Sequence, residues 1–189
     1  VLVVEAGRGG EFDEARLIAP DVSVLTPIML EHPDKLGPTV QDIARTKTRI
    51  TAPGSTIVVA PQPEPVWETI SAAAAEIGAQ TIVVDAVTRI ANVTQAATGM
   101  VADLSGPFGD LPQLHISLAG AHQVANAATA LTAAQALAQR RQTAITRQGA
   151  YDGLARVRWP GRCQVIAQQP WILLDGAISA EAACYACDM

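Results

Sequence analysis

Short runs of β-branched and other apolar residues recur along this chain, and stretches with helical spacing separate them. The four clearest runs are residues 1–4 (VLVV), 22–26 (VSVLT), 56–60 (TIVVA) and 81–84 (TIVV). Buried parallel strands have this composition, and helices are the usual connections between such strands. The pattern therefore predicts an α/β fold with a mostly parallel sheet flanked by helices.

The segments between and after these runs divide into helices and one β-rich excursion. Residues 39–47 and 65–77 carry apolar residues at helical spacing, so each predicts a helix that covers the sheet. Residues 85–116 contain short β-like pieces interrupted by glycines, which predicts a small antiparallel excursion. Helical patterns return over residues 122–138 and 143–155.

The last part of the chain begins a new unit. Residues 162–174 predict two strands joined by a turn, and a sharp corner at residues 175–176 leads into another expected helix. Pro and Gly at residues 160–161 break the chain just before this unit. We therefore expect a domain over residues 1–158 and the start of a second α/β domain over residues 159–189.

Charge and hydropathy exclude several classes of partner. Lys and Arg number 13 against 18 Asp and Glu, the formal net charge is −5, and there is no basic run, so we expect no nucleic-acid partner. No apolar stretch approaches the roughly 18 residues of a membrane span. The chain also lacks the basic start of a signal peptide, so we expect a cytoplasmic protein without a membrane partner.

The three cysteines give weak signals. Cys184 and Cys187 form a CxxC pair, but a zinc site needs a second ligand pair and a redox site needs a thioredoxin-like context. The other cysteine is Cys163. We interpret the pair as two small apolar residues on a helix.

Three side chains follow apolar runs or end a helix in positions that suit chemistry. Glu5 follows the first run, and His32 follows the second. Because parallel strands end at a common sheet edge, we expect these two side chains to lie close together and to suit a divalent cation. Lys47 ends the next predicted helix. The residues alone leave open a solvated Glu5 in a glycine turn and a Lys47 that merely favours the helix dipole.

Ordered short motifs run along nearly the whole chain. They are residues 5–13 (EAGRGGEFD), 31–32 (EH), 42–50 (DIARTKTRI), 53–58 (PGSTIV), 118–127 (LAGAHQVANA), 153–162 (GLARVRWPGR) and 175–177 (DGA). In order and spacing they resemble the central ATPase domain of the Mur ligase superfamily, most closely its folylpolyglutamate and dihydrofolate synthase branch. The resemblance implies a P-loop NTPase-like domain, followed by the first β-hairpin and helix of a Rossmann-like C-terminal domain.

The resemblance implies an ATP-dependent amide ligase. Such enzymes activate a carboxylate, here of a folate-like substrate, as an acyl phosphate, which the amine of L-glutamate attacks. ATP and Mg²⁺ are the implied co-substrate and cofactor. The matching positions are Glu5 and His32 for Mg²⁺ ligands, with His32 also counted as catalytic, Lys47 for a catalytic carbamylated lysine, Asn126 for an ATP contact, and Arg162 and Asp175 for nucleotide contacts.

Several positions depart from the family pattern. Glu11 stands where the family has Arg, Arg49 where it has Gly, and Glu31 where it has Asp. At residue 178 an Ile replaces a His. The family's glycine-rich phosphate loop lies upstream of residue 5, and the chain has no initiator Met, so we expect a piece of a longer protein that does not hydrolyse ATP alone.

Three functional hypotheses follow. The first is a working folylpolyglutamate-synthase-like ligase, of which this chain is the central domain and a short continuation. The second is a diverged homologue that keeps the fold as a binding or regulatory module without ligation. The third is a Mur-type ligase for a different carboxylate. In all three we expect His122 to be hydrogen-bonded at a helix start rather than to bind metal.

Overall fold

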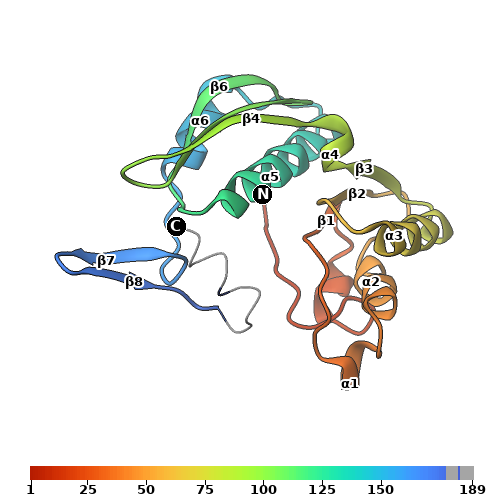
Figure 1. Ribbon diagram of the computed structural model, residues 1–189. Coiled ribbons are helices and arrows are strands. Elements are labelled where there is room, and N and C mark those ends of the chain that lie inside the picture. Colours follow the sequence, from red (N-terminus) through yellow and green to blue (C-terminus); the bar gives the residue numbers. More distant parts are fainter. Residues whose placement is uncertain (178–182, 184–189) are drawn as a thin grey trace. The chain divides into compact units, whose positions relative to one another are not determined.

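The computed structural model describes residues 1–177 and residue 183. The chain divides into two compact units (Figure 1). The first comprises residues 1–87 and 132–143, and the second comprises residues 88–131 and 144–189. Helix α5 (Ala121–Arg140) contributes its beginning to the second unit and its end to the first.

The first unit is built on a three-stranded parallel sheet with the order β1-β2-β3. The strands are β1 (Val22–Leu25), β2 (Thr56–Val59) and β3 (Gln80–Val83). The helices of this unit, besides the end of α5, are η1 (Glu14–Ile18, a 3-10 helix), α1 (Pro33–Leu36), α2 (Val40–Thr48), α3 (Glu64–Ile77) and α4 (Val84–Val87). The predicted parallel sheet is therefore confirmed.

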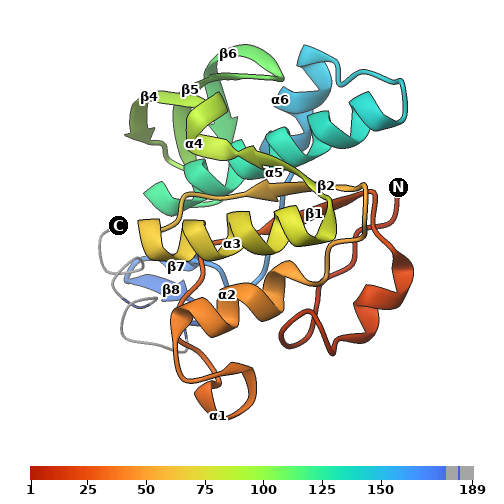
Figure 2. The ribbon, with the colours of Figure 1, turned by 90° about the vertical axis from the view of Figure 1, so that its right-hand side faces the viewer.

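Helices cover both faces of this sheet. In two views α2 and α3 lie on one face, and the end of α5 lies on the other (Figures 1 and 2). Every residue of the middle strand β2 is buried, as its uninterrupted apolar sequence requires. Ile43 of α2, Ile57 of β2 and Ile70 of α3 are each 0% exposed and belong to one apolar cluster.

The ends of α2 and α3 follow from their sequence. Thr39 and Asp42 form a capping box at the start of α2, in which the Thr39 hydroxyl accepts the N–H of Asp42 and the Asp42 carboxylate accepts the N–H of Thr39. Gly78 ends α3 in the left-handed conformation that glycine adopts most easily. The helices predicted over residues 39–47 and 65–77 are confirmed to within one residue at each end.

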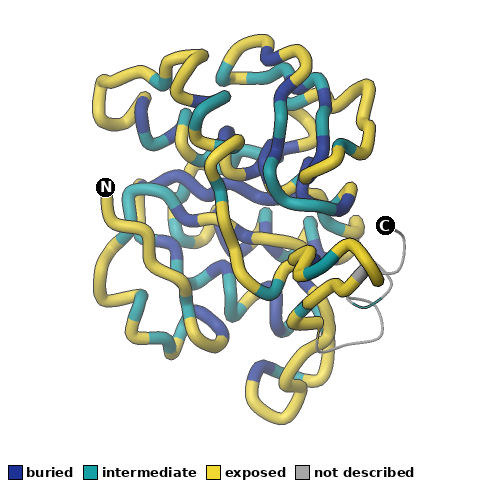
Figure 3. Tube along the Cα trace, turned by 90° about the vertical axis from the view of Figure 1, so that its left-hand side faces the viewer, coloured by how far each residue is buried: buried dark blue, intermediate teal, exposed yellow. Residues whose placement is uncertain are grey.

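The strand predicted over residues 1–4 is wrong. Val1, Leu2, Val3 and Val4 form no strand and are 46% to 106% exposed (Figure 3). A strand needs a neighbouring strand to receive its backbone hydrogen bonds. Among the described residues β1 pairs with β2, and β2 also pairs with β3, but no strand pairs with residues 1–4. The apolar pattern alone did not show whether a partner strand is present.

The second unit contains the expected antiparallel excursion. Its strands are β4 (Arg89–Gln95), β5 (Met100–Gly106) and β6 (Gly109–Ile116), in that order in one sheet. Alternate residues of β5 are buried, as in a sheet with one covered face. The core includes Leu104 and Leu114, together with Val124 from the first half of α5.

Helix α6 (Arg147–Ala155) packs beside β6, where the Tyr151 hydroxyl donates to the Pro112 carbonyl. It begins four residues later than the predicted residue 143, because the Thr146 hydroxyl caps it by accepting the N–H of Gly149. Residue 143 is also a threonine, and no local pattern indicates which of the two threonines caps the helix.

Strands β7 (Gln164–Gln168) and β8 (Trp171–Leu174) form an antiparallel hairpin, which confirms the predicted strand-turn-strand unit. The helix expected after residue 177 and the CxxC pair lie outside the described residues. The domain boundary expected at residues 158/159 remains a prediction. None of the described helices combines the length and hydropathy that a membrane span needs.

Candidate functional site

The loop that follows β1 is tied to the segment that follows β2. The side-chain oxygen of Gln62 accepts the N–H of Ile28 at 3.0 Å, and its amide nitrogen donates to the Thr26 carbonyl at 2.9 Å. One side chain therefore fixes the chain at the carboxyl ends of two neighbouring strands. We did not anticipate this role, although a polar residue just after a buried strand was the available signal.

Lys47 contacts the loop after β1 at Glu31. The side chain lies in the last turn of α2, and its Nζ is 2.7 Å from Oε1 of Glu31. His32 is the next residue and precedes α1 with a φ of 46°. The structure thus brings Lys47 to the Glu31-His32 pair. Glu31 as the partner of Lys47 was not predicted, because the two residues are 16 positions apart (47 − 31) and belong to different elements.

The glycine loop before η1 is packed onto the end of α2. A Cβ on Gly10 would lie 2.7 Å from the carbonyl oxygens of both Thr46 and Lys47. The N–H of Glu11 donates to the same Thr46 carbonyl at 3.0 Å. Glycine is therefore required here by close packing against the turn that carries Lys47. The loop also borders a hollow of about 570 Å³, whose other wall includes Lys35 of α1.

Two residues that depart from the family pattern form an ion pair. Nη1 of Arg49 lies 3.1 Å from Oε1 of Glu11. Glu11 belongs to the glycine loop and Arg49 directly follows α2, so the pair joins the two segments that pack together at Gly10. The acidic substitution at residue 11 is thus balanced by the basic substitution at residue 49.

Glu5 is not joined to this cluster by any hydrogen bond or ion pair among the described residues, and its side chain is exposed. The expected position of Glu5 beside His32 depends on residues 1–4 forming a strand of the same sheet, and these residues form no strand. Within the described part of the chain, no three His, Cys, Asp or Glu side chains gather as a metal site would need. The convergence of Glu5, His32 and Lys47 remains a prediction.

A second set of candidate residues lies at the start of α5. The Asn126 amide donates to Oε1 of Gln123 at 3.1 Å, and Nε2 of Gln123 lies 3.0 Å from Nε2 of His122. Gly120 has a φ of +103°, and a Cβ there would come within 2.6 Å of the His122 ring. Burial lowers the pKa of His122, an effect that the Asp175 carboxylate partly opposes. His122 is thus hydrogen-bonded at a helix start, as predicted.

Asp175 lies at the corner after β8, and Arg162 lies just before β7. The Asp175 carboxylate accepts the N–H of Cys163 at 2.8 Å and lies 3.4 Å from its Sγ. The Cys163 N–H is the main reason that the pKa of Asp175 is lowered. Burial first, and then the Asp175 carboxylate, raise the pKa of Cys163 to about 11. Arg162 donates to the carbonyl of Gly161 at 3.3 Å. Contact of Asp175 and Arg162 with a nucleotide remains a prediction.

Comparison with known proteins agrees with this architecture. The Mur ligase middle domain model matches residues 1–134. The folylpolyglutamate synthase of Lacticaseibacillus casei is 31% identical over 177 residues, which are 94% of this chain and 41% of that protein. The solved structure of an FPGS (folylpolyglutamate synthase)–AMPPCP–folate complex matches with a TM-score of 0.92 at 30% identity. The match covers 97% of this chain and 45% of the chain in that complex.

The folylpolyglutamate synthase of Mycobacterium tuberculosis complexed with ADP has a TM-score of 0.88 at 29% identity and covers 97% of this chain and 41% of that one. The chain thus spans less than half the length of these relatives. The fold expected from the motifs is confirmed by these structures. With its middle-domain match over most of its length, the chain belongs to the Mur ligase family.

Proposed function

We propose that the protein is an ATP-dependent ligase that adds L-glutamate to a folate-type carboxylate through an acyl phosphate. The observation that carries the proposal is the placement of Lys47 at 2.7 Å from Glu31, beside His32, on a Mur ligase middle domain. Similarity to folylpolyglutamate synthases supports glutamate transfer, and the related complex with AMPPCP and folate supports the two other substrates.

The reaction sets an electrostatic problem. An oxygen of the substrate carboxylate bonds to the γ-phosphorus of ATP while the bond to the bridging oxygen of ADP breaks. The glutamate amine then bonds to the acyl carbon, phosphate leaves, and the amine loses a proton. Both steps bring anions together, so they need cations and fixed dipoles for stabilisation. Mg²⁺, when bound, supplies part of that positive charge.

The residues present suit Mg²⁺. This ion keeps several water ligands and typically uses one or two protein carboxylates together with substrate phosphates. It therefore does not need three converging protein side chains. We propose Glu5 and His32 as its ligands from this chain. In this assignment His32 also holds the ion toward the substrate, which is the basis of its catalytic role.

We propose that Lys47 works as a carbamate. The ammonium loses one proton, and the neutral amine then bonds to CO₂ and releases a second proton, so the side chain changes from cation to anion. The Glu31 carboxylate lies 2.7 Å from Nζ of Lys47, and the same carboxylate would repel a carbamate. A cation between the two anions would relieve this repulsion, so a metal ion close to Lys47 and Glu31 is compatible with a carbamate there.

The second unit supplies the proposed nucleotide contacts. Asn126 and Arg162 are exposed side chains with hydrogen-bond donors, which suit an anionic or heteroaromatic ligand. Asp175 holds the segment that carries Arg162 through its contacts with Cys163. We propose that Asn126 contacts ATP and that Arg162 and Asp175 contact or position the nucleotide.

Mass spectrometry of the folate product tests the proposal in the full-length protein. With ATP, Mg²⁺, L-glutamate and a folate, the product should gain one glutamyl residue for each ADP released. Omitting any one component should abolish the product, and His32→Ala should reduce it strongly. Nucleotide binding without any ligation would favour the non-catalytic module. Ligation of glutamate to a different carboxylate, with none to folate, would favour the third hypothesis.

A further inference from the structure

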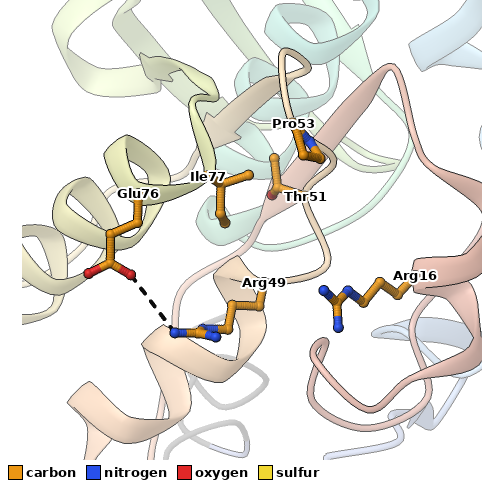
Figure 4. A pocket seen from close by; sticks show the side chains of 6 residues that line it. All are labelled: Arg16, Arg49, Thr51, Pro53, Glu76 and Ile77. Carbon is orange, nitrogen blue, oxygen red and sulfur yellow. Dashed lines mark ion pairs between the residues drawn. The ribbon is translucent and has the colours of Figure 1, made fainter.

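The first unit contains a second hollow, separate from the site around Lys47. Its volume is about 300 Å³. The hollow is lined by two arginines, one glutamate, a buried threonine and two apolar residues (Figure 4). The lining residues are Arg16, Arg49, Thr51, Pro53, Glu76 and Ile77.

The two arginines approach the hollow from different elements and differ in their partners. Arg16 extends from η1, and its described hydrogen bond is a donation to the Glu11 carbonyl at 3.2 Å. Within the described part of the chain no carboxylate forms an ion pair with it. Arg49 pairs with Glu11 at 3.1 Å and more loosely with Glu76 at 3.8 Å. Arg16 is thus the less neutralised of the two cations.

Thr51 lies at the hollow with an unused hydroxyl. The residue is only 4% exposed, and its Oγ1 has no hydrogen-bond partner among the described residues. A buried hydroxyl without a partner destabilises the fold, because water no longer satisfies it. The backbone of Thr51 is held by a hydrogen bond, since its N–H donates to the Thr48 carbonyl at 3.0 Å. A ligand oxygen in the hollow would satisfy this hydroxyl after the Thr51 side chain rotates toward it, because Oγ1 itself is buried.

We propose that this hollow binds a small molecule through an oxyanion, a phosphate or carboxylate group, held by Arg16, Arg49 and the Thr51 hydroxyl. Planar guanidinium groups match the oxygens of both anions. The hollow is larger than a bare oxyanion, and Ile77 in its lining would give a carbon skeleton attached to that group an apolar contact.

Glu76 competes with this ligand. The Glu76 side chain is 69% exposed, and its 3.8 Å distance from Arg49 is longer than the 3.1 Å between Arg49 and Glu11. The ligand therefore displaces Glu76 readily. Removing the Glu76 charge should therefore strengthen binding, whereas removing the Arg16 charge should weaken it. Both effects also have the sign expected from net charge alone, so an arginine variant outside the hollow is needed to distinguish a site from a general response to net charge.

The test is a titration of the ¹⁵N-labelled protein with inorganic phosphate and, separately, with succinate, at constant ionic strength. Saturable shifts should appear at the amides of residues 49–52. Arg16→Gln should weaken binding about tenfold, the usual effect of losing a charge-assisted hydrogen bond. Glu76→Gln should strengthen it about threefold, and Thr51→Val should weaken it about threefold, as for one neutral hydrogen bond.

Arg45→Gln is the matched control. It removes the same charge from an exposed residue of α2 that does not line the hollow, and it should leave both affinities unchanged. Because Arg16 and Glu76 are also exposed, their variants should fold normally, as a thermal unfolding curve will show. Binding of phosphate alone assigns a phosphorylated ligand, and binding of succinate alone assigns a carboxylate. Absence of saturable shifts with both probes, or equal effects of Arg16→Gln and Arg45→Gln, would overturn the proposal.

Discussion

Asp175 and Cys163 form a pair in which each residue shifts the pKa of the other. The Cys163 N–H lowers the pKa of the carboxyl, while burial and that carboxylate raise the pKa of the thiol to about 11. At pH 8 the Asp175 side chain is therefore ionised and the thiol is protonated. Since the thiolate is the reactive form, Cys163 should be inert in the native protein.

The reactivity of the Cys163 thiol can be measured by alkylation with iodoacetamide at pH 8, followed by peptide mass spectrometry. Cys163 should react on the order of a hundredfold more slowly in the native protein than in urea, where its pKa returns to about 8.5. Asp175→Asn should speed the native reaction, because it removes a charge that disfavours the thiolate. Equal rates in the native and denatured states would contradict the pairing.

Gly10 is the residue on which the packing of the glycine loop against α2 depends. Gly10→Ala would put a Cβ 2.7 Å from two backbone carbonyl oxygens, neither of which can move independently of the helix. Overpacking of this kind should destabilise the protein by about 1–3 kcal/mol. Urea unfolding measures the loss.

The control is Gly153→Ala. Gly153 lies in α6, and nothing lies within 4 Å of a Cβ built on it. Alanine favours helix over glycine, so this variant should be stabilised by about 0.5–1 kcal/mol. If both variants were equally stable, the loop would not be packed as described.

At the scale of elements, Gln62 connects the ends of β1 and β2 by accepting from Ile28 and donating to Thr26. Gln62→Ala leaves a backbone N–H and a carbonyl without this partner. The expected loss of stability is about 1–2 kcal/mol by urea unfolding, since each net hydrogen bond contributes about 1 kcal/mol.

The same variant should also lower ligase turnover, because the released loop carries Glu31 and His32. Gln148→Ala provides the comparison. Gln148 is exposed on α6, and among the described residues its side chain bonds to Asp152 four residues away, so its loss should change neither property. Normal turnover in Gln62→Ala would show that the loop keeps its position without Gln62.

The elements themselves could be predicted from the sequence, because strands and helices depend on local periodicity. Strands β1, β2 and β3 and helices α2 and α3 lie where the apolar spacing placed them. Residues 1–4 have the same local pattern and form no strand, since a strand also requires a neighbour. Pairing across the fold is not encoded in any local pattern.

The candidate site shows the same limit. The motifs indicated His32 and Lys47, but not that Glu31 pairs with Lys47 or that Glu11 pairs with Arg49. Glu11 and Arg49 are 38 positions apart, and only the packing of the glycine loop on α2 brings them together. Two signals were available in the sequence. Glu31 is a carboxylate directly before a candidate metal ligand, and Glu11 reverses a charge in a motif.

Across the whole molecule, burial differs sharply between segments, and hydrogen exchange should follow it. Strand β2 is buried and pairs with a neighbouring strand on each side, so its amides should exchange among the slowest in the first unit. Amides of residues 2–4 have no ladder partner among the described residues and should exchange within seconds. Protection of residues 2–4 comparable to that of β2 would contradict the structure.

The central claim is that Lys47 of a Mur ligase middle domain takes part in glutamate ligation. The most direct test is ADP release by the full-length protein with folate and L-glutamate, in the wild type, Lys47→Ala and Arg45→Ala. Arg45 is an exposed cation on the same helix, so its variant controls for a lost charge. We predict that Lys47→Ala loses on the order of a hundredfold or more in rate, as when a charge-stabilising group is removed, while Arg45→Ala keeps the wild-type rate. Wild-type turnover in Lys47→Ala would contradict the account.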